Sequence, residues 1–341
     1  MKNCKNAALP PGALMLAPMV EYSHGALRAL IHEFGACDRY YGEMCGAPAY
    51  LSDAPYDEWF LDPYPAPERS VMQFFSPDEP RMVAAVRKLL AERAAAGVPV
   101  GGVDLNFGCA APLIEKQGGG VRWMKDPAAA AAMTAAVRRA ADELSPGLLI
   151  SAKMRLGYDE SAEALLSFAR GLEAAGADYL VLHPRLKDQK FRRAGKWDYV
   201  ALLSRELSIP VIGNGDVRDY EGFYQATERY GAAGVMIGRE AVRRPWIFAL
   251  IRGREAAPGF SMEIGLEEVG LRMIELIRQR LPLEFHLSRA KRFFFYYCDN
   301  LSFSHHLRFA IQNAADLEAI ERLFRAYFDE VPADRRRVET A

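Results

Sequence analysis

Short, continuous runs of apolar residues recur at fairly even intervals along most of the chain. Runs without strict alternation of apolar and polar positions are typical of strands buried on both faces, as in a parallel sheet. The pattern predicts eight strands: LMLAPM (14–19), RYYGEM (39–44), SVMQFF (70–75), GVDLNFG (102–108), LLISAKMR (148–155), YLVLHPR (179–185), PVIGNGD (210–216) and GVMIGR (234–239).

The segments between these runs carry signals for the ends of helices. Ser76, Pro77 and Glu79 predict a helix start, because they supply a capping hydroxyl, a first-turn proline and the acid of a capping box. Gly97 predicts the end of that helix, and residues 126–127 (Asp-Pro) predict the start of the next one.

Eight strand-helix units in about 250 residues indicate an α/β fold, a closed (β/α)8 TIM barrel, because open doubly wound sheets usually stop at about six strands. After Pro258 the strand signals end, and amphipathic helical patterns follow. We therefore expect a barrel domain over residues 1–255 and a small all-α helical domain over residues 256–341.

Composition is that of a soluble globular protein, with 50% hydrophobic and 26% charged residues in a chain of 341. The longest uncharged stretch, residues 6–20, is too short and too rich in proline to span a bilayer, and the N-terminus lacks the apolar core of a secretion signal. We expect a cytoplasmic, monomeric protein with no membrane partner.

The five cysteines are odd in number and far apart, and none shows C-x-x-C spacing. We therefore expect no disulfide and no bound metal. Cys37, Cys45 and Cys298 are interpreted as small buried residues.

Charge is balanced over the whole chain, with 43 basic and 44 acidic residues. Two segments are locally basic. Residues 185–196 hold six basic residues and one acid, and residues 272–308 hold seven basic residues and three acids. Any polyanionic partner would therefore be bound by local patches rather than by the overall charge.

The carboxyl ends of the strands, which form the mouth of a (β/α)8 barrel, are where the active site lies in this fold. Distinctive residues stand at seven of the eight predicted ends. They are Pro18 and Met19, Gln73, Asn106 and Cys109, Lys153 and Arg155, His183 and Arg185, Asn214 with Gly215 and Asp216, and Gly238 with Arg239. Any one alone is more often a satisfied buried polar group, but so many at one end predict a site.

The last two strand ends predict a phosphate site. Loops at these positions usually bind phosphate in this fold, because glycines let backbone N–H groups approach the anion. Gly215 and Gly238 supply such glycines, and Arg239 supplies a fixed positive charge. The alternative is that the glycines only form tight turns, which we favour for Gly213.

Lys153 is expected to project into the mouth, where an unpaired charge is costly, so it should meet an anion. A reduced flavin carries negative charge on its pyrimidine side, and Gln73 offers donors and an acceptor to the edge of that ring. An ion pair of Lys153 with Asp104 or Asp216 is the alternative.

Cys109 follows LNFG at the tip of the fourth strand, in a loop that would place its thiol at the mouth. A thiol with an ordinary pKa of about 8.5 is mostly protonated at neutral pH, so Cys109 can serve as a proton donor to a carbanion.

Together these residues resemble the tRNA-dihydrouridine synthases, a family of flavin enzymes with an N-terminal (β/α)8 barrel and a C-terminal helical domain. The matching elements are LAPM (16–19), the glutamine of VMQFF, DLNFGCAAP followed by KQGGG (116–120), AKMRLG, HPR with a later WDY, GNGD, and MIGR with a later PW. The chain departs from the family at three places. Ala110 and Ala111 separate Cys109 from Pro112, HPRL (183–186) stands where the family has H-G-R-T, and the glycine-rich stretch ends in GGGVRW (118–123) rather than in small residues.

The resemblance implies FMN contacts from Pro18, Met19, Val20, Gln73, Lys153, His183, Asn214, Gly215, Asp216, Gly238 and Arg239, with Cys109 as the catalytic proton donor. The candidates for contact with substrate are Asn106, Arg155, Arg185, Lys190, Arg289, Lys291 and Arg292. In the helical segment 288–297, Phe293, Phe294 and Phe295 are expected to pack in the core, with the basic residues facing outward.

The implied reaction is the NAD(P)H- and FMN-dependent reduction of uridines in tRNA to 5,6-dihydrouridine. The C5=C6 bond of uracil is conjugated to a carbonyl, so carbon 6 accepts hydride from reduced FMN and Cys109 protonates carbon 5. NADPH is the expected reductant, and it would reach the flavin directly, because no G-x-G-x-x-G segment follows a strand. The uridine must also be turned out of its stack.

Two other functions are open at this stage. A flavin reductase of a free pyrimidine or another small enone would explain the cofactor residues and Cys109 but not the basic helices. A non-catalytic RNA-binding protein on a barrel scaffold would explain the helices and would carry no flavin.

Overall fold

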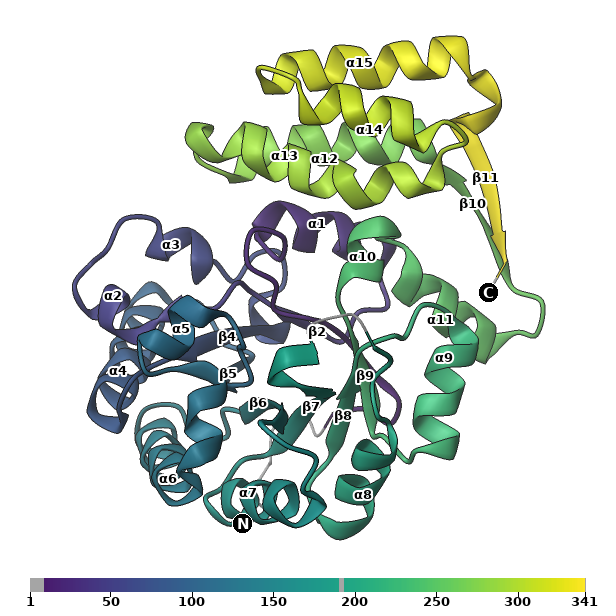
Figure 1. Ribbon diagram of the computed structural model, residues 1–341. Coiled ribbons are helices and arrows are strands. Elements are labelled where there is room, and N and C mark those ends of the chain that lie inside the picture. Colours follow the sequence, from purple (N-terminus) through teal and green to yellow (C-terminus); the bar gives the residue numbers. More distant parts are fainter. Residues whose placement is uncertain (1–8, 190–192, 341) are drawn as a thin grey trace. The chain divides into compact units, whose positions relative to one another are not determined.

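Within residues 9–189 and 193–340, which the computed structural model describes, eight parallel strands close into a barrel (Figure 1). The strands are β1 (Ala13–Leu16), β2 (Arg39–Tyr41), β4 (Ser70–Phe75), β5 (Gly102–Phe107), β6 (Ile150–Gly157), β7 (Tyr179–Leu186), β8 (Val211–Asn214) and β9 (Gly234–Ile237). β1 pairs with β2 and β9, and β2 pairs with β4, which closes the cylinder. The (β/α)8 fold and all eight predicted strands are confirmed; the short β3 (Cys45–Gly46), paired with β4, was not predicted.

The chain divides into two compact units. The barrel unit comprises residues up to 18, 38–217 and 221–237, and the second unit comprises 19–37, 218–220 and 238–341. The expected domain boundary after residue 255 stays a prediction. Helices between the strands of the barrel unit are α2 (Ala47–Leu51), α3 (Asp57–Phe60), α4 (Glu79–Ala96), α5 (Pro112–Lys116), α6 (Pro127–Leu144), α7 (Ala162–Ala174) and α8 (Asp198–Glu206), with α9 (Tyr220–Tyr224) before β9.

Side-chain caps explain where the longest of these helices begin. The N-cap of α4 is Asp78, whose carboxylate accepts the backbone N–H of Arg81 at 3.0 Å. The prediction that Ser76 caps this helix is wrong, because its hydroxyl accepts the N–H of Asp78 in a turn just before the helix. Gly97, with φ of 64°, ends α4 as predicted, and Asp126 caps α6 as predicted.

The second unit is mainly helical. Its helices are α1 (Gly25–Phe34), α10 (Arg239–Arg243), α11 (Ile247–Ala256), α12 (Leu266–Arg280), α13 (Leu283–Tyr297), α14 (Ser304–Gln312) and α15 (Leu317–Glu330). α12 packs against α1, α13 and α15 (Figure 1). This packing agrees with the amphipathic patterns read beyond Pro258.

The prediction that strands end before Pro258 is wrong. β10 (Ser261–Gly265) and β11 (Arg336–Thr340) pair as an antiparallel sheet of two strands. Both segments are five residues long, and neither contains a continuous apolar run: β10 reads SMEIG, and β11 reads RRVET, with three charged residues. Ion pairs such as Arg336 with Glu263 stabilise the pairing instead.

Aromatic rings form the core of the second unit. Phe293 stacks on Tyr297 with 4.9 Å between ring centroids, and Phe294 lies 4.8 Å from Phe324. Gly270 of α12 lies against the same cluster, where an added Cβ would lie 2.2 Å from the ring of Phe324. Glycine at this position therefore lets α12 and α15 approach closely.

Among the described residues, every helix is too short or too polar to cross a lipid bilayer.

Candidate active site

Parallel pairing brings the candidate side chains into register across neighbouring strands. Gln73 of β4 pairs with Asp104 of β5, and Asp104 pairs with Ser151 of β6. Asn106 pairs with Lys153 two residues nearer the mouth. Because alternate residues of a strand face the same side, Asp104 and Asn106 share one face of β5.

A continuous run of hydrogen bonds connects this layer to the backbone around Cys109. Gln73 Nε2 donates to Asp104 Oδ2 at 2.7 Å, and Asn106 Nδ2 donates to Gln73 Oε1 at 2.9 Å. Asn106 Oδ1 accepts the backbone N–H groups of Gly108 at 3.1 Å and Cys109 at 2.9 Å. The Asn106 amide therefore fixes the start of the Cys109 loop.

On its other side Asp104 contacts a group of hydroxyls. Ser151 Oγ donates to Asp104 Oδ1 at 2.5 Å. The Tyr41 hydroxyl lies 3.2 Å from Ser151 Oγ and 2.7 Å from the Tyr179 hydroxyl. Burial raises the pKa of Asp104 to about 6, and the hydrogen bonds from Ser151 and Gln73 and the charge of Lys153 oppose that shift.

The Cys109 thiol is only half-buried, whereas Cys37, Cys45 and Cys298 are buried as predicted. Burial raises the pKa of the Cys109 thiol, and a hydrogen bond from the backbone of Ala111, followed by the positive charges of Arg155 and Lys153, offsets this only in part. The thiol is therefore protonated at neutral pH, which is the state that a proton donor needs.

The glycine-rich segment supports this loop from behind. Val121 N–H donates to the carbonyl of Cys109 at 3.0 Å. Gly120 has φ of 62°, and an added Cβ there would lie 2.4 Å from the same carbonyl. Glycine is therefore required at position 120, for its backbone conformation as well as for space.

Lys153 and Arg155 place positive charge beside Cys109. Within residues 9–189 and 193–340, Lys153 forms no salt bridge with Asp104 or Asp216, although its charge and that of Asp104 attract each other. Burial is the main reason that the pKa of Lys153 falls to about 8, and the charge of Arg155 adds to the effect. Arg155 Nε donates to the Gly108 carbonyl at 3.0 Å, while its buried Nη1 lacks a hydrogen-bond partner among the described residues.

Arg185 joins the ends of β7 and β8. Its guanidinium donates to both carboxylate oxygens of Asp216 at 2.6 and 2.7 Å and to the carbonyl of Arg193 at 2.6 Å. It also lies 3.0 Å from His183 Nε2. Because a guanidinium only donates, this contact is a hydrogen bond when His183 Nε2 is the acceptor. The predicted contact of Arg185 with substrate stays a prediction.

The turn after β8 has an unusual backbone. Gly215 has φ of 117°, Asp216 has φ of 63°, and the Asn214 amide donates to the carbonyl of Met236 at 2.8 Å. A Cβ added to Gly215 would lie 3.1 Å from the Arg185 guanidinium. At Gly213 it would lie 2.2 Å from the ring of Trp197, so packing explains that glycine, as favoured above.

Four of the FMN candidates belong to the second unit: Met19, Val20, Gly238 and Arg239. Met19 N–H donates to Ser23 Oγ at 2.9 Å, Val20 is 52% exposed, and Arg239 begins α10. Their contact with a cofactor stays a prediction, as does that of Pro18. Lys190 lies outside the described residues.

Two predictions for α13 are wrong. Arg289 does not face outward: it is buried, lies 4.6 Å from the Phe285 ring centroid and pairs with Glu21 at 3.2 Å. Phe295 does not pack in the core, since it is 46% exposed. Phe293 and Phe294 are buried as predicted. Arg292 is exposed and pairs with Glu21 at 2.5 Å.

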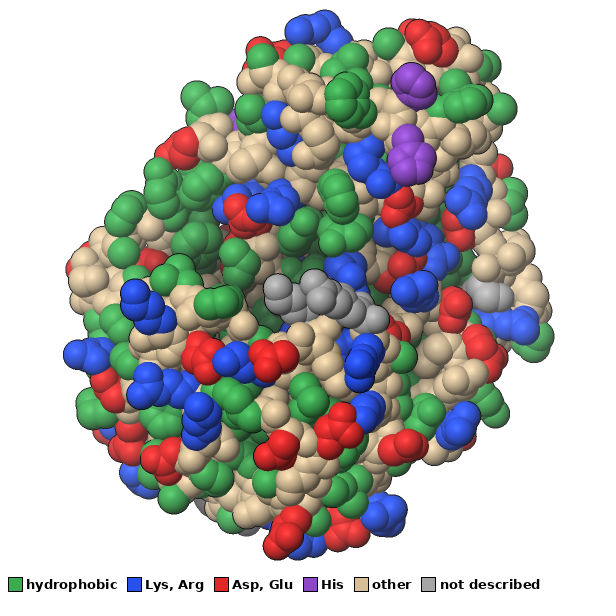
Figure 2. Space-filling view, viewed as in Figure 1, with side chains coloured by type: hydrophobic (Ala, Val, Ile, Leu, Met, Phe, Trp, Pro, Cys, Tyr) green, Lys and Arg blue, Asp and Glu red, His purple; other side chains and the backbone are tan. Residues whose placement is uncertain are grey.

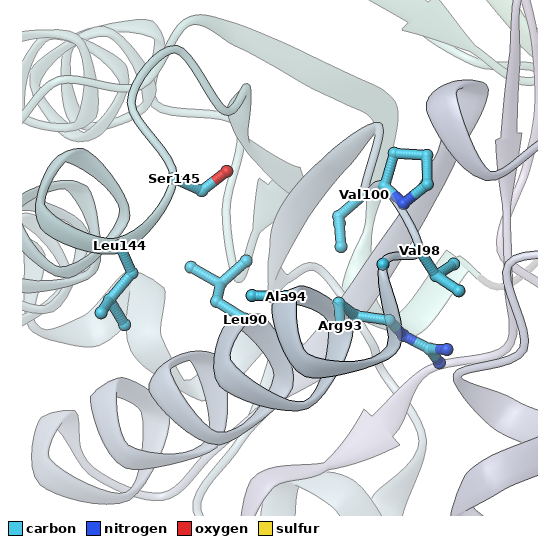
Figure 3. A pocket seen from close by; sticks show the side chains of 9 residues that line it. Leu90, Arg93, Ala94, Val98, Val100, Leu144 and Ser145 are labelled. Carbon is cyan, nitrogen blue, oxygen red and sulfur yellow. The ribbon is translucent and has the colours of Figure 1, made fainter.

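A cavity of about 340 Å³ lies elsewhere, at the amino ends of the strands (Figure 3). Leu90 and Ala94 of α4, Leu144 at the end of α6 and Val100 before β5 line it. None of the candidate residues lines this cavity, so it is separate from the candidate active site.

Sequence reasoning missed the inner layer of the site. Asp104 was considered only as a possible partner of Lys153, and Ser151, Tyr41 and Tyr179 were not considered. The available signal was the D-x-N spacing on β5, which places Asp104 directly beneath Asn106 on the same strand face.

Comparisons with known proteins give a consistent result. Residues 15–331 match the family model described as dihydrouridine synthase. A probable tRNA-dihydrouridine synthase of Aquifex aeolicus is 28% identical over 82% of this chain and 83% of its own length. The tRNA-dihydrouridine(16) synthases of Cupriavidus necator and Pseudomonas syringae are 37% and 36% identical, over 45% and 50% of this chain. Those two alignments span about half of each relative, 46% and 54%.

Among solved structures, morphinone reductase aligns with a TM-score of 0.48 and 11% identity, over 72% of this chain and 91% of that one. This likeness is too weak to carry a functional conclusion.

Proposed function

Because the chain belongs to the dihydrouridine synthase family, we propose that it reduces specific uridines of tRNA to 5,6-dihydrouridine, with bound FMN and with NADPH as the reductant. One observation carries the proposal. The half-buried thiol of Cys109, whose pKa is raised by burial, lies near two cations, Lys153 and Arg155, at the end of the strands where barrel enzymes do their chemistry.

The barrel residues fit an FMN group. The Lys153 ammonium has no carboxylate within ion-pair distance among the described residues, so it is suited to the anionic side of a reduced flavin. Gln73 keeps one amide hydrogen and one lone pair beyond the bonds that it makes to Asp104 and Asn106, and these can contact the ring edge. The remaining proposed contacts are Pro18, Met19, Val20, His183, Asn214, Gly215, Asp216, Gly238 and Arg239.

FMN, when bound and reduced, supplies a hydride for carbon 6 of uracil. The chain's own residues provide for the charge and the proton. The buried Nη1 of Arg155 is suited to donate to the uracil carbonyl on which enolate charge develops. Asn106 fixes the backbone of Cys109, and the Cys109 thiol donates the proton to carbon 5.

Contact with tRNA is proposed for local surfaces. Figure 2 shows acidic and basic side chains interspersed on the face in view rather than one basic field. In the second unit, the exposed ring of Phe295 lies 5.2 Å from the Arg308 guanidinium, and it stands one helical turn after Lys291 and Arg292 on α13. Exposed aromatic rings beside basic groups suit unpaired bases and phosphates.

The test uses tRNA that lacks dihydrouridine. The purified protein, its flavin absorbance recorded beforehand, is incubated with this tRNA and NADPH, and the nucleosides are mapped by mass spectrometry. We expect flavin absorbance and a uridine that gains two hydrogens at a defined position, with position 16 examined first because of the named relatives. Turnover of free uracil without any change in the tRNA would favour a small-molecule reductase, and a colourless, inactive protein would favour an RNA-binding role.

A further inference from the structure

Two groups of hydrogen-bonded side chains converge on Asp104, whose exposed fraction is zero. The loop arm comprises Gln73 and Asn106 and ends at the backbone of Cys109. The tyrosine arm comprises Ser151, Tyr41 and Tyr179. An ionised carboxylate only accepts hydrogen bonds, so both arms must present a donor to Asp104.

This requirement fixes the direction of every bond in the loop arm. Gln73 has to turn its NH₂ toward Asp104, which turns its oxygen toward Asn106. Asn106 must then present its NH₂ to that oxygen, which leaves its own oxygen facing the N–H groups of Gly108 and Cys109. A reversed amide at either residue would place two donors against each other inside the barrel, at the cost of an unsatisfied buried group.

The tyrosine arm is directed in the same way. Ser151 donates its only hydroxyl hydrogen to Asp104, so its bond to Tyr41 requires Tyr41 as the donor. The hydroxyl of Tyr179 must then donate to Tyr41.

We infer that Asp104 is a positioning residue that fixes the Cys109 loop through Gln73 and Asn106, because it is the acceptor from which both amides take their orientation. The consequence for catalysis rests on the proposed function. The positioning itself does not, because the loop is fixed whether or not the substrate is tRNA.

The first test replaces the carboxylate by an amide. In Asp104→Asn the side chain has one acceptor oxygen, so Gln73 and Ser151 compete for it. In the molecules where Ser151 takes that oxygen, the amides of Gln73 and Asn106 reverse, and Asn106 no longer accepts from the loop. The readout is the rate at which 2,2′-dithiodipyridine labels Cys109 in full-length protein that carries Cys4→Ser. The other cysteines, Cys37, Cys45 and Cys298, are buried. We expect labelling to be faster by about two- to fivefold, which corresponds to the partial or full loss of one net hydrogen bond.

The second test moves the carboxylate one position along the loop arm. In Asp104→Asn combined with Gln73→Glu, Glu at 73 accepts from the amide at 104 and from Asn106, and the amide oxygen at 104 accepts from Ser151. The hydrogen bonds that Asn106 makes to position 73 and to the Cys109 loop then have their native donors and acceptors. Labelling of Cys109 should therefore return to the native rate. The matched control is Tyr179→Phe, which alters the outer end of the tyrosine arm but keeps the hydrogen bond from Ser151 to Asp104, and which should leave labelling unchanged.

The inference is overturned if folded Asp104→Asn is labelled at the native rate, or if the double variant is labelled as fast as the single one.

If Asp104→Asn does not fold, the pH dependence of labelling in the native protein decides. Gln73, Ser151, Lys153, Tyr41 and Tyr179 face Asp104. The pKa values of the two tyrosines are raised, and that of Lys153 is about 8. Asp104, with a pKa of about 6, is therefore the group in this set that changes its charge near pH 6.

A change in the labelling rate near pH 6, in addition to the change that ionisation of the thiol causes, supports the inference. A labelling rate that follows ionisation of the thiol alone contradicts it. The tRNA assay separates this inference from the proposed function. A native protein that forms dihydrouridine but shows no labelling response overturns only the positioning role. A labelling response without dihydrouridine overturns only the proposed function.

Discussion

Lys153 carries a charge that no ion pair with a described residue neutralises. Burial lowers its pKa from 10.5 to about 8, so the ammonium form destabilises the folded protein at neutral pH. Side chains of this kind are typical of sites built for a ligand rather than for stability.

Lys153→Met should therefore separate stability from function. We expect the flavin-free variant to be more stable than the native protein at pH 7 by about 1 to 3 kcal/mol, because the desolvated charge is removed. Between about pH 8 and 10.5, Lys153 is deprotonated in the folded state but still protonated in the unfolded state. The native protein should therefore become more stable as the pH rises through this range, and the variant should lack that gain.

Thermal unfolding of the flavin-free proteins and FMN titration measure the two effects. FMN should bind more weakly to Lys153→Met, and the exposed replacement Arg325→Met should change neither quantity. A variant that is less stable than the native protein without flavin, or that binds FMN equally well, contradicts the assigned role of Lys153.

The residues that sequence could predict are those whose place follows from one strand. Gln73, Asn106, Lys153 and Cys109 stand at strand ends, and barrel topology brings such ends together. The partners of Arg185 could not be predicted, because Asp216 lies 31 residues away and only the fold brings the two together. The same holds for Arg289, which packs against Glu21 from the start of the chain.

Among the helices and strands, the apolar pattern predicted the barrel strands, whereas the capping residues placed one helix start incorrectly. The eight barrel strands followed from the pattern because they are buried on both faces. β10 and β11 did not, because neither segment contains a continuous apolar run and their pairing joins residues 261–265 to residues 336–340, far apart in the sequence. The start of α4 was placed two residues early, since Ser76 and Asp78 are both good capping residues and only the structure shows which one accepts a helix N–H.

Helix α1 has an N-cap that depends on pH. His24 Nδ1 accepts the backbone N–H of Leu27 at 3.4 Å, which requires that nitrogen to be unprotonated. Burial, followed by the charges of Arg289 and Arg28, lowers the pKa of His24 from 6.5 to about 3. The folded state thus binds this proton less readily than the unfolded state, and the associated stability is lost as pH falls below 6.5.

Replacing His24 by Asn keeps a capping acceptor and removes this titration. Between pH 7 and pH 5 we expect the native protein to lose about 2 kcal/mol of unfolding free energy relative to His24→Asn. Denaturant unfolding at the two pH values measures the difference, with His305→Asn on the exposed surface of α14 as the matched control. An identical pH response in His24→Asn and the native protein would show that the cap is not titrating.

At the scale of the whole molecule, family membership and site geometry support the same chemistry. The family match covers both units, from residue 15 to residue 331. The net charge of −1 and the mixed charges in Figure 2 argue that tRNA is bound through local contacts, so affinity should depend on particular side chains more than on overall charge.

The most direct test compares native protein with Cys109→Ala in a single turnover. Both proteins are loaded with FMN, reduced by NADPH and mixed with tRNA that lacks dihydrouridine, and the dihydrouridine formed is followed over time. We expect equal flavin content, equal reduction by NADPH and dihydrouridine formation at least about 100-fold slower in the variant, because the proton donor is missing. Dihydrouridine formation at the native rate by Cys109→Ala would contradict the role of Cys109 as proton donor.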